Sequence, residues 1–450
     1  MRIKRQIQPS RLTNTRLIAL GFLAVILAGS VLLSLPAAAR NGIRVPYLTA
    51  LFTSVSATCV TGLSVADTYS TWSVFGQVVI LILIQIGGLG FMSVITMLSV
   101  FLHRRVGLRE RRLLMESAGT MRISGMIRLI RKIMIGTALF EGTGAVVLAF
   151  RFCPRMGLGE GIYTAVFHSV SAFCNAGFDL MGKYRKFSSL TEFCGDFTVN
   201  ITVAVLIITG GLGFIVWEDI AQNRFNFKKY ELHSKLVLSV TAVLTVVPTV
   251  WFYLSERIGA FAAIDGGGKW LAAFFQAVTP RTAGFNTVDL GALSENGKLM
   301  TLILMLVGGS PGSTAGGIKT TTLAVLLLGA VAASRHTKHI TVFKRRLEGG
   351  ALNRACAVFT VYTAVAAAAA AVLCAAEDCS LYEAVFEAVS AIGTVGLTTG
   401  ITPRLGVLSD IVLMVLMYGG RVGGLSLMLS LAEKRVNVQL ERPCEKVLIG

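Results

Sequence analysis

The sequence predicts an all-α integral membrane protein in which four copies of one helical unit surround a central pore. Composition supports this, because 54% of the 450 residues are hydrophobic and only 15% are charged, whereas about a quarter of the residues in a soluble domain carry charge. Apolar runs of about 20 residues, long enough to cross a bilayer as helices, recur along the whole chain. A short sequence motif, called the phrase below, also occurs four times along the chain. Together these observations exclude a large soluble catalytic domain.

Eight long apolar segments are predicted to be transmembrane helices. The first of them could instead be a signal peptide, because three alanines follow it, but its apolar stretch is longer than a usual signal core. The predicted spans are 17–35, 73–102, 132–150, 198–217, 236–254, 297–333, 356–375 and 407–432.

A shorter segment lies between the two long segments of each pair and cannot cross about 30 Å of hydrocarbon as a helix. We therefore expect four re-entrant pore helices, at 46–58, 162–173, 268–280 and 381–392. Each contains one phrase, which reads FTSVS, FHSVS, FQAVT or FEAVS and begins at Phe52, Phe167, Phe275 or Phe386. A Gly-Gly pair follows in each unit, at Gly87–Gly88, Gly210–Gly211, Gly308–Gly309 and Gly419–Gly420.

The repetition divides the chain into parts of roughly 110 residues, and chance similarity at four positions in the same register is a weak competing explanation. The predicted parts are an N-terminus, 1–16, four repeats at 17–125, 126–228, 229–346 and 347–432, and a C-terminal tail, 433–450. Segments on the N-terminal side of the predicted spans hold 28 of the 42 Lys and Arg residues, and positive charge gathers on the cytoplasmic side. Both termini are therefore predicted to be cytoplasmic. Membrane topology explains much of the net charge of +18, and no nucleic-acid partner is predicted.

Each predicted pore helix leads into a glycine-containing loop. Irregular backbone at membrane depth must be buried or line a water-filled path, so four such loops around one axis predict a pore. The loops contain no carboxylate, and their backbone carbonyls could replace the hydration shell of K⁺ if glycine turns them inward. The alternative is that the glycines only allow close helix packing. The predicted filter residues are Val60, Thr61, Gly62, Asn175, Ala176, Gly177, Thr282, Ala283, Gly284, Thr394, Val395 and Gly396.

A stretch of small residues interrupts the apolar segment 297–333. It cannot hold a regular helix, and lipid would leave its backbone groups unsatisfied, so we expect it to lie under the filter as a gate. It resembles a phosphate-binding loop only weakly, because Ile318 separates the last glycine from the Lys-Thr pair. The predicted gate residues are Gly308, Gly309, Ser310, Pro311, Gly312, Ser313, Thr314, Ala315, Gly316, Gly317 and Lys319.

Charged residues inside apolar segments are functional candidates. We expect the guanidinium of Arg421 to hydrogen-bond the carbonyls of the gate loop and latch it. Arg421 and Lys319 could instead extend to the membrane surface, and Glu141 could be a packing contact or a proton relay. We find no constellation of acid, base, metal or nucleophile that predicts an enzyme. The scattered cysteines predict no structural metal, and no covalently bound cofactor is expected.

These residues resemble the Trk/Ktr/HKT superfamily of K⁺ transport proteins, whose members resemble four fused M1-P-M2 units of a K⁺ channel. The most specific matches are the four filter glycines, the segment 279–286, the loop 308–319 and Arg421. Within the superfamily the chain is similar to KtrB, the bacterial membrane subunit, because it begins at the first long span, without the two extra N-terminal spans of TrkH. Its last six residues, 445–450, also resemble KtrB tails.

The resemblance implies K⁺ uptake across the bacterial plasma (inner) membrane by a homodimer with one pore per subunit. It also implies a separate cytosolic nucleotide-binding ring of RCK type, such as KtrA, so that nucleotide acts only through this partner. Na⁺ as an activator is left open. The alternatives are a proton-coupled Trk-type symporter or, from another class, a membrane receptor or enzyme that uses the same cavity.

Overall fold

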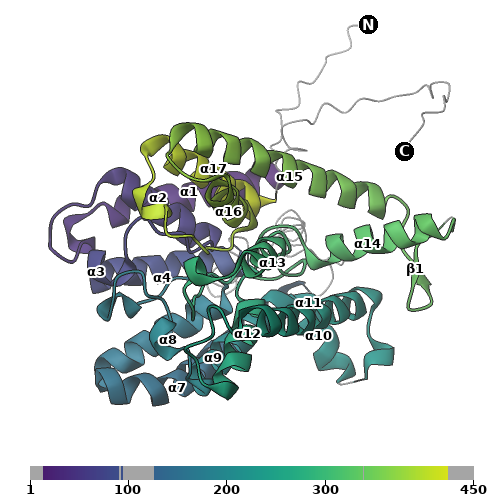
Figure 1. Ribbon diagram of the computed structural model, residues 1–450, viewed down its shortest axis with the longest axis horizontal. Helices are drawn as coiled ribbons and strands as arrows, with labels where there is room; N and C mark the ends of the chain where they lie inside the picture. Colours follow the sequence, from purple (N-terminus) through teal and green to yellow (C-terminus); the bar gives the residue numbers. More distant parts are fainter. Residues whose placement is uncertain (1–13, 91–92, 95–125, 225, 338, 424–450) are drawn as a thin grey trace, which may run out of the picture.

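Four long helices follow the apolar runs of the sequence, and Figure 1 shows their arrangement. The computed structural model describes residues 14–90, 93–94, 126–224, 226–337 and 339–423. Within these residues four helices are long and apolar enough to cross a membrane, and between 22% and 28% of the apolar window of each is buried inside the protein. Most of their side chains therefore face outward, as lipid-facing helices require. They are α1 (Asn14–Leu33), α7 (Met126–Met156), α11 (Leu232–Glu256) and α15 (Ala351–Ala376).

A short helix follows each long helix and packs against it. The longest of the four has 16 residues, which at 1.5 Å per residue is too short to cross about 30 Å of hydrocarbon. The first residue of the repeated phrase is a phenylalanine in each, and at most 1% of its surface is exposed. The four are α2 (Tyr47–Cys59), α8 (Leu158–Phe173), α12 (Gly266–Val278) and α16 (Leu381–Gly393).

The second apolar helix of each unit is shorter than predicted. Helix α9 (Phe197–Leu212) ends at Gly213, and α10 (Phe214–Asn223) leaves at an angle of 94°. The predicted span 198–217 thus consists of two helices joined at an angle, because Gly213 adopts a φ of +93°, which ends the first helix and which glycine tolerates.

Helices α4 (Val74–Leu89) and α17 (Val407–Val422) also end before glycines with positive φ, Gly90 and Gly423. The described residues thus contain four candidate spans, or five if the bent pair counts as one, and not eight. Most of 90–102 and all of 424–432, which belong to two predicted spans, lie outside the described residues, as do 1–13, most of the 103–132 segment and the 433–450 tail.

The third unit has no helix between α13 (Glu295–Met305) and α14 (Thr320–Ser334). A short bridge between Val307 and Ile318 closes this irregular loop at its base. The connection to the fourth unit contains a hairpin, β1 (Thr341–Val342) and β2 (Arg345–Arg346), which the all-α prediction missed. Its turn residues, Phe343 and Lys344, both have positive φ, as a tight hairpin turn requires. The remaining elements of the described chain are α3 (Thr68–Thr71) and six 3-10 turns.

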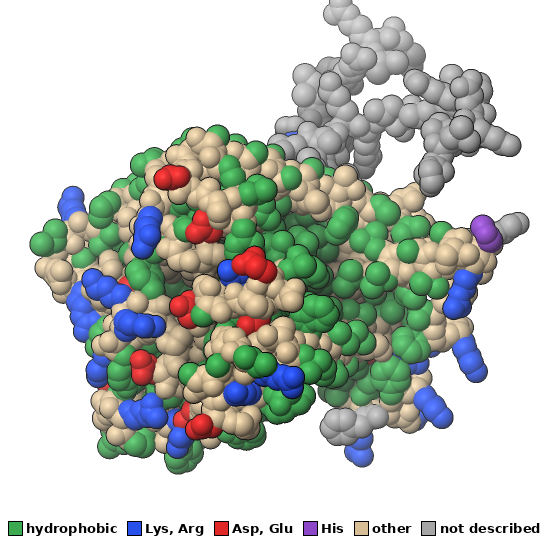
Figure 2. Space-filling view, in the orientation of Figure 1, with side chains coloured by type: hydrophobic (Ala, Val, Ile, Leu, Met, Phe, Trp, Pro, Cys, Tyr) green, Lys and Arg blue, Asp and Glu red, His purple; other side chains and the backbone are tan. Residues whose placement is uncertain are grey.

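Charged side chains gather at the two ends of the helices, and a largely uncharged surface lies between them (Figure 2). Acidic side chains appear on the left side of this view, together with basic ones. The hairpin end on the right carries Lys, Arg and His without visible acidic groups. This distribution is the one expected of a protein that spans a bilayer.

Candidate functional site

The four glycine loops meet in a closed ring, although they are far apart in the sequence. A Cβ atom added to Gly177 would lie 2.8 Å from the carbonyl oxygen of the residue before Gly284 and 3.0 Å from the Cα of Gly284. A Cβ added to Gly284 would likewise contact Gly396 and the carbonyl oxygen before it. One on Gly396 would make the same contacts with the loop of Gly62, and one on Gly62 with the loop of Gly177. The structure therefore brings together the four glycines and the residue before each of them, which are eight of the twelve residues of the predicted filter. The neighbouring carbonyls belong to Ala176, Ala283, Val395 and Thr61.

All four loops share one backbone conformation. Each glycine has a φ between +70° and +90°, and the residue two positions earlier also has a positive φ, between +51° and +69°. Three of these earlier residues are Val60, Thr282 and Thr394, β-branched types for which a left-handed conformation costs about 1–3 kcal/mol. Such residues give no sequence signal for this conformation. The fourth is Asn175, a type that adopts it more readily.

The last residue of the repeated phrase ties each loop to its own short helix. The N–H of Thr61 donates to the Ser56 carbonyl at 2.8 Å, and the equivalent bonds in the second and fourth loops have the same length. The hydroxyl of Ser171 donates to the Phe178 carbonyl at 2.7 Å, and that of Thr279 to the Phe285 carbonyl at 2.6 Å. These bonds give the repeated register of the phrase a physical role that was not predicted from the sequence.

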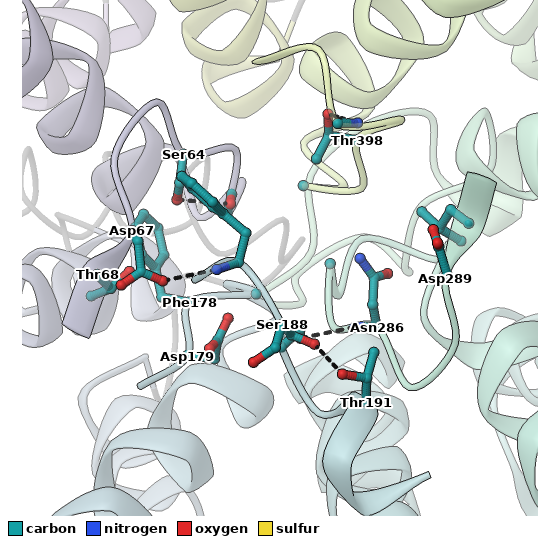
Figure 3. A pocket seen from close by; sticks show the side chains of 18 of the residues that line it. Ser64, Asp67, Thr68, Phe178, Asp179, Ser188, Thr191, Asn286, Asp289 and Thr398 are labelled. Atoms are coloured by element: carbon teal, nitrogen blue, oxygen red, sulfur yellow. Dashed lines mark hydrogen bonds between the residues drawn. The ribbon is translucent and has the colours of Figure 1, made fainter. Parts of the chain in front are cut away.

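A cavity of about 270 Å³ lies on one side of the ring and includes all four glycines in its lining. Three carboxylates, Asp67, Asp179 and Asp289, lie around it in Figure 3. The oxygens of Asp67 accept hydrogen bonds from the backbone N–H groups of Ser70 (2.8 Å) and Phe187 (3.1 Å). Sequence reasoning missed these acidic groups because they lie on connecting loops outside the repeated register.

The glycine-rich loop lies on the opposite side of the ring. The loop contacts residues that come just before the ring glycines in the sequence, such as Thr282 and Thr394. The cavity is lined by the ring glycines and by residues that come after them, such as Ser64 and Thr398. A Cβ on Gly308 would contact the Thr282 side chain, and one on Gly316 would meet that of Thr394. The Thr314 hydroxyl donates to the Phe173 carbonyl at 3.1 Å, and Phe214 N–H donates to the Gly312 carbonyl at 2.8 Å. The loop is thus held against the base of the ring.

The two cations that were predicted inside apolar segments, Arg421 and Lys319, bond backbone carbonyls. The guanidinium of Arg421 donates to the Thr314 carbonyl of the loop and to the carbonyls of Gly87 and Gly88 at the end of α4. The ammonium of Lys319 turns back onto the loop and donates to the Ala315 carbonyl at 2.7 Å. Arg421, in the fourth repeat, therefore ties the loop of the third repeat to α4 of the first.

The register of Arg421 differs from the one read from the sequence. A Cβ on Gly420 would meet the Ile392 carbonyl in the last turn of α16, just as one on Gly87 or Gly210 would meet the last turn of α2 or α8. Gly420 is thus the structural equivalent of Gly87, and Arg421 that of Gly88. The match of Gly419–Gly420 to the other Gly-Gly pairs was wrong by one residue, because a dipeptide carries no information about which glycine makes the contact.

Glu141 on α7 lies against α4 and α8. One of its oxygens accepts a hydrogen bond from the Gln85 amide at 3.2 Å, and the other lies 3.9 Å from the thiol sulfur of Cys174. These contacts are of the kind that the packing interpretation predicts. The proton-relay alternative stays a prediction.

A ring of loops inside an apolar helical bundle, with an acidic cavity on one side and a tethered loop on the other, defines a membrane transport protein. The family model TrkH, described as a cation transport protein, matches residues 13–439. The chain belongs to this family, whose members are transporters and not enzymes. The predicted resemblance is confirmed.

Curated relatives and a solved structure agree with this assignment. The chain is 38% identical over 428 residues to the Ktr system potassium uptake protein B of Bacillus subtilis, covering 94% of both chains. It is 39% identical over 457 residues to the potassium/sodium uptake protein NtpJ of Enterococcus hirae, covering 100% of both. The crystal structure of the potassium transporter TrkH from Vibrio parahaemolyticus superimposes with a TM-score of 0.74 at 18% identity, over 95% of this chain and 86% of that one. This last similarity shows the same all-helical fold.

Proposed function

We propose that this protein takes up K⁺ through the ring of glycine loops, in a four-repeat M1-P-M2 architecture. The observation that carries the proposal is the closed contact of Gly62, Gly177, Gly284 and Gly396. A dehydrated K⁺ needs a cage of oxygens, and four loops of one conformation supply backbone carbonyls around one axis. The described loops place no carboxylate in the ring itself, so an acidic filter is not proposed. The names of the two relatives include potassium uptake.

The acidic cavity is the outer mouth in this proposal. Carboxylates around a confined opening raise the local concentration of cations. The connector between α10 and α11 and the β1–β2 hairpin expose Lys228, Lys229, Lys344 and Arg345, and basic connectors favour the cytoplasmic side. These basic connectors support the proposal that both termini lie in the cytoplasm of a bacterium, with the protein in its plasma (inner) membrane.

The loop 308–317 is the gate, and Arg421 is its latch. The loop lies across the base of the ring, and the guanidinium ties it to α4. An intramembrane cation at this position also repels K⁺ from the path. Opening requires that the Arg421 contacts break or move together with the loop.

The working assembly is a homodimer, with one pore per subunit, on a cytosolic ring of RCK type that binds nucleotide. The name of the relative, which assigns it to a Ktr system, supports the partner subunit. The name of the other relative includes sodium, which supports Na⁺ as an activator or second transported ion. A proton-coupled symporter is the second candidate function, because Glu141 is a carboxyl group at membrane depth.

Ion flux into liposomes tests the proposed function. We expect the purified protein, at a clamped membrane potential, to move K⁺ and Rb⁺ faster than Na⁺ and Li⁺, with the direction set by the electrochemical gradient. Protein-free liposomes are the control. If neither the wild-type protein nor the variant without the gate loop conducts any cation, the protein does not form a pore. The four glycines would then serve only helix packing.

External pH is expected to change the apparent K⁺ affinity. Burial and the charge of nearby Asp67 raise the pKa of Asp179 to about 7, although a hydrogen bond from the Met181 N–H opposes the rise. The carboxyl group is thus ionised above this pH and neutral below it, so the mouth attracts K⁺ less strongly at pH 6 than at pH 8. K⁺ uptake at graded concentrations measures the effect.

The Asp179→Asn variant separates this mouth effect from proton coupling. We expect the variant to show a low apparent affinity at both pH values, with its pH dependence lost. A pH dependence that persists in Asp179→Asn but disappears in Glu141→Gln would favour the symporter instead.

A further inference from the structure

The fourth short helix contains a buried carboxyl group that the proposed transport path does not use. Glu387 is the second residue of the repeated phrase in α16, and 0% of its surface is exposed. Its oxygens accept hydrogen bonds from the Thr398 hydroxyl, from the Thr399 N–H (3.3 Å) and from the Thr402 hydroxyl (2.9 Å). Among the described residues, no salt bridge joins it to a cation. Neutral donors of one short segment therefore hold this group.

That segment, 398–402, forms part of the outer cavity. Thr398, Thr399 and Gly400 line it, beginning two residues after the ring glycine Gly396, and Figure 3 shows Thr398 beside it. The hydroxyl oxygens of Thr402 and Thr398 also lie 2.8 Å apart. Glu387 thus connects helix α16 to the backbone segment that follows the ring glycine Gly396.

The second unit has the same connection with a different residue. His168 occupies the position equivalent to Glu387, and its Nε2 accepts a hydrogen bond from the Leu180 N–H at 3.4 Å. Leu180 follows Gly177 by three residues, just as Thr399 follows Gly396.

The other two units differ at this position. The Thr53 hydroxyl donates within its own helix, to the Thr49 carbonyl at 2.8 Å, and the Gln276 amide donates to Thr301 on α13 at 3.4 Å. Two of the four equivalent side chains therefore bond the segment that follows a glycine loop, and the other two bond residues elsewhere.

We propose that Glu387 is a positioning residue that fixes the exit segment of the fourth glycine loop and thereby sets the discrimination of the ring between K⁺ and Na⁺. This inference rests on the proposed function. A cage distinguishes the two ions only while its oxygens stay at the spacing that suits the larger one. Without Glu387, three donors lose their acceptor, the exit segment moves, and the loop can close around Na⁺.

Paired K⁺ and Na⁺ fluxes in liposomes test this inference. We expect Glu387→Ala to lower the K⁺/Na⁺ flux ratio at least about fivefold, because buried donors are left without an acceptor. Thr402→Val, which removes one donor from the other side, should shift the ratio in the same direction by a smaller factor. Glu387→Gln keeps an amide oxygen for Thr398 and Thr399, so its ratio should stay within about twofold of wild type. Thr53→Ala, the equivalent position in the first unit, is the control and should not change the ratio.

Two results would overturn the inference. One is an unchanged ratio in Glu387→Ala while both ions are still transported. The other is an equal loss of both fluxes, which would indicate a purely structural role. If Glu387→Ala does not fold, Thr402→Val decides, and an unchanged ratio there overturns the inference. A wild-type protein without K⁺ preference would instead contradict the proposed function.

Discussion

Replacing Gly177 with serine is expected to lower the K⁺/Na⁺ flux ratio at least about tenfold, which corresponds to about 1.4 kcal/mol of lost discrimination. Gly177 has a φ of +70°, and a Cβ there would lie 2.8 Å from the backbone oxygen of Ala283. Because that oxygen belongs to the next loop, the side chain can be accommodated only if the ring itself changes spacing. Flux of K⁺ and Na⁺ through the reconstituted variant measures the effect.

Gly42→Ser is the matched control for this prediction. Gly42 also has a positive φ, +68°, but nothing lies within 4 Å of a Cβ at that position. The control therefore shares the backbone strain without the contact to a neighbouring loop, and it should retain the wild-type ratio. A Gly177→Ser protein that folds and keeps the full ratio would show that the ring does not select the ion.

Removing the Arg421 latch is expected to raise uptake at least about fivefold, because an intramembrane cation and its tether to the gate are lost together. Arg421→Ala removes the hydrogen bonds to Thr314, Gly87 and Gly88. Deletion of 308–317 should have a similar effect. Uptake of K⁺ from low external concentrations measures the change.

Lys228→Ala is the control for charge alone, because Lys228 is an exposed cation on the η4 turn (Phe227–Lys229), outside the lining of the cavity. Arg421→Lys should be intermediate, since lysine keeps the charge but cannot reach carbonyls on two sides with one planar group. Unchanged uptake in both Arg421→Ala and the loop deletion would discard the gate assignment.

Much of the site could be predicted because four copies of one phrase mark it. The short helices begin and end within a few residues of their predicted bounds, since each phrase lies in an apolar segment too short to cross the bilayer. The break between α13 and α14 followed from the helix-breaking residues of 308–317. In each case a local property of the sequence determined the structure.

Other features depend on contacts between distant segments, which one sequence does not reveal. The left-handed conformation of Thr394 is held by its surroundings, since threonine has no preference for it. The 94° bend at Gly213 accompanies a bond between Phe214 and the gate loop. The cavity aspartates lie on loops with no repeated register, and the register of Arg421 became visible only through the contact of Gly420 with α16.

Anomalous X-ray diffraction from crystals grown with Rb⁺ in place of K⁺ tests the central claim most directly. We expect anomalous Rb⁺ density on the axis of the ring, surrounded by backbone carbonyls from all four glycine loops, and this density should persist when an equal concentration of Na⁺ is added. Rb⁺ bound elsewhere, with an empty ring, in a protein that transports Rb⁺ would contradict the claim that these loops form the selective path.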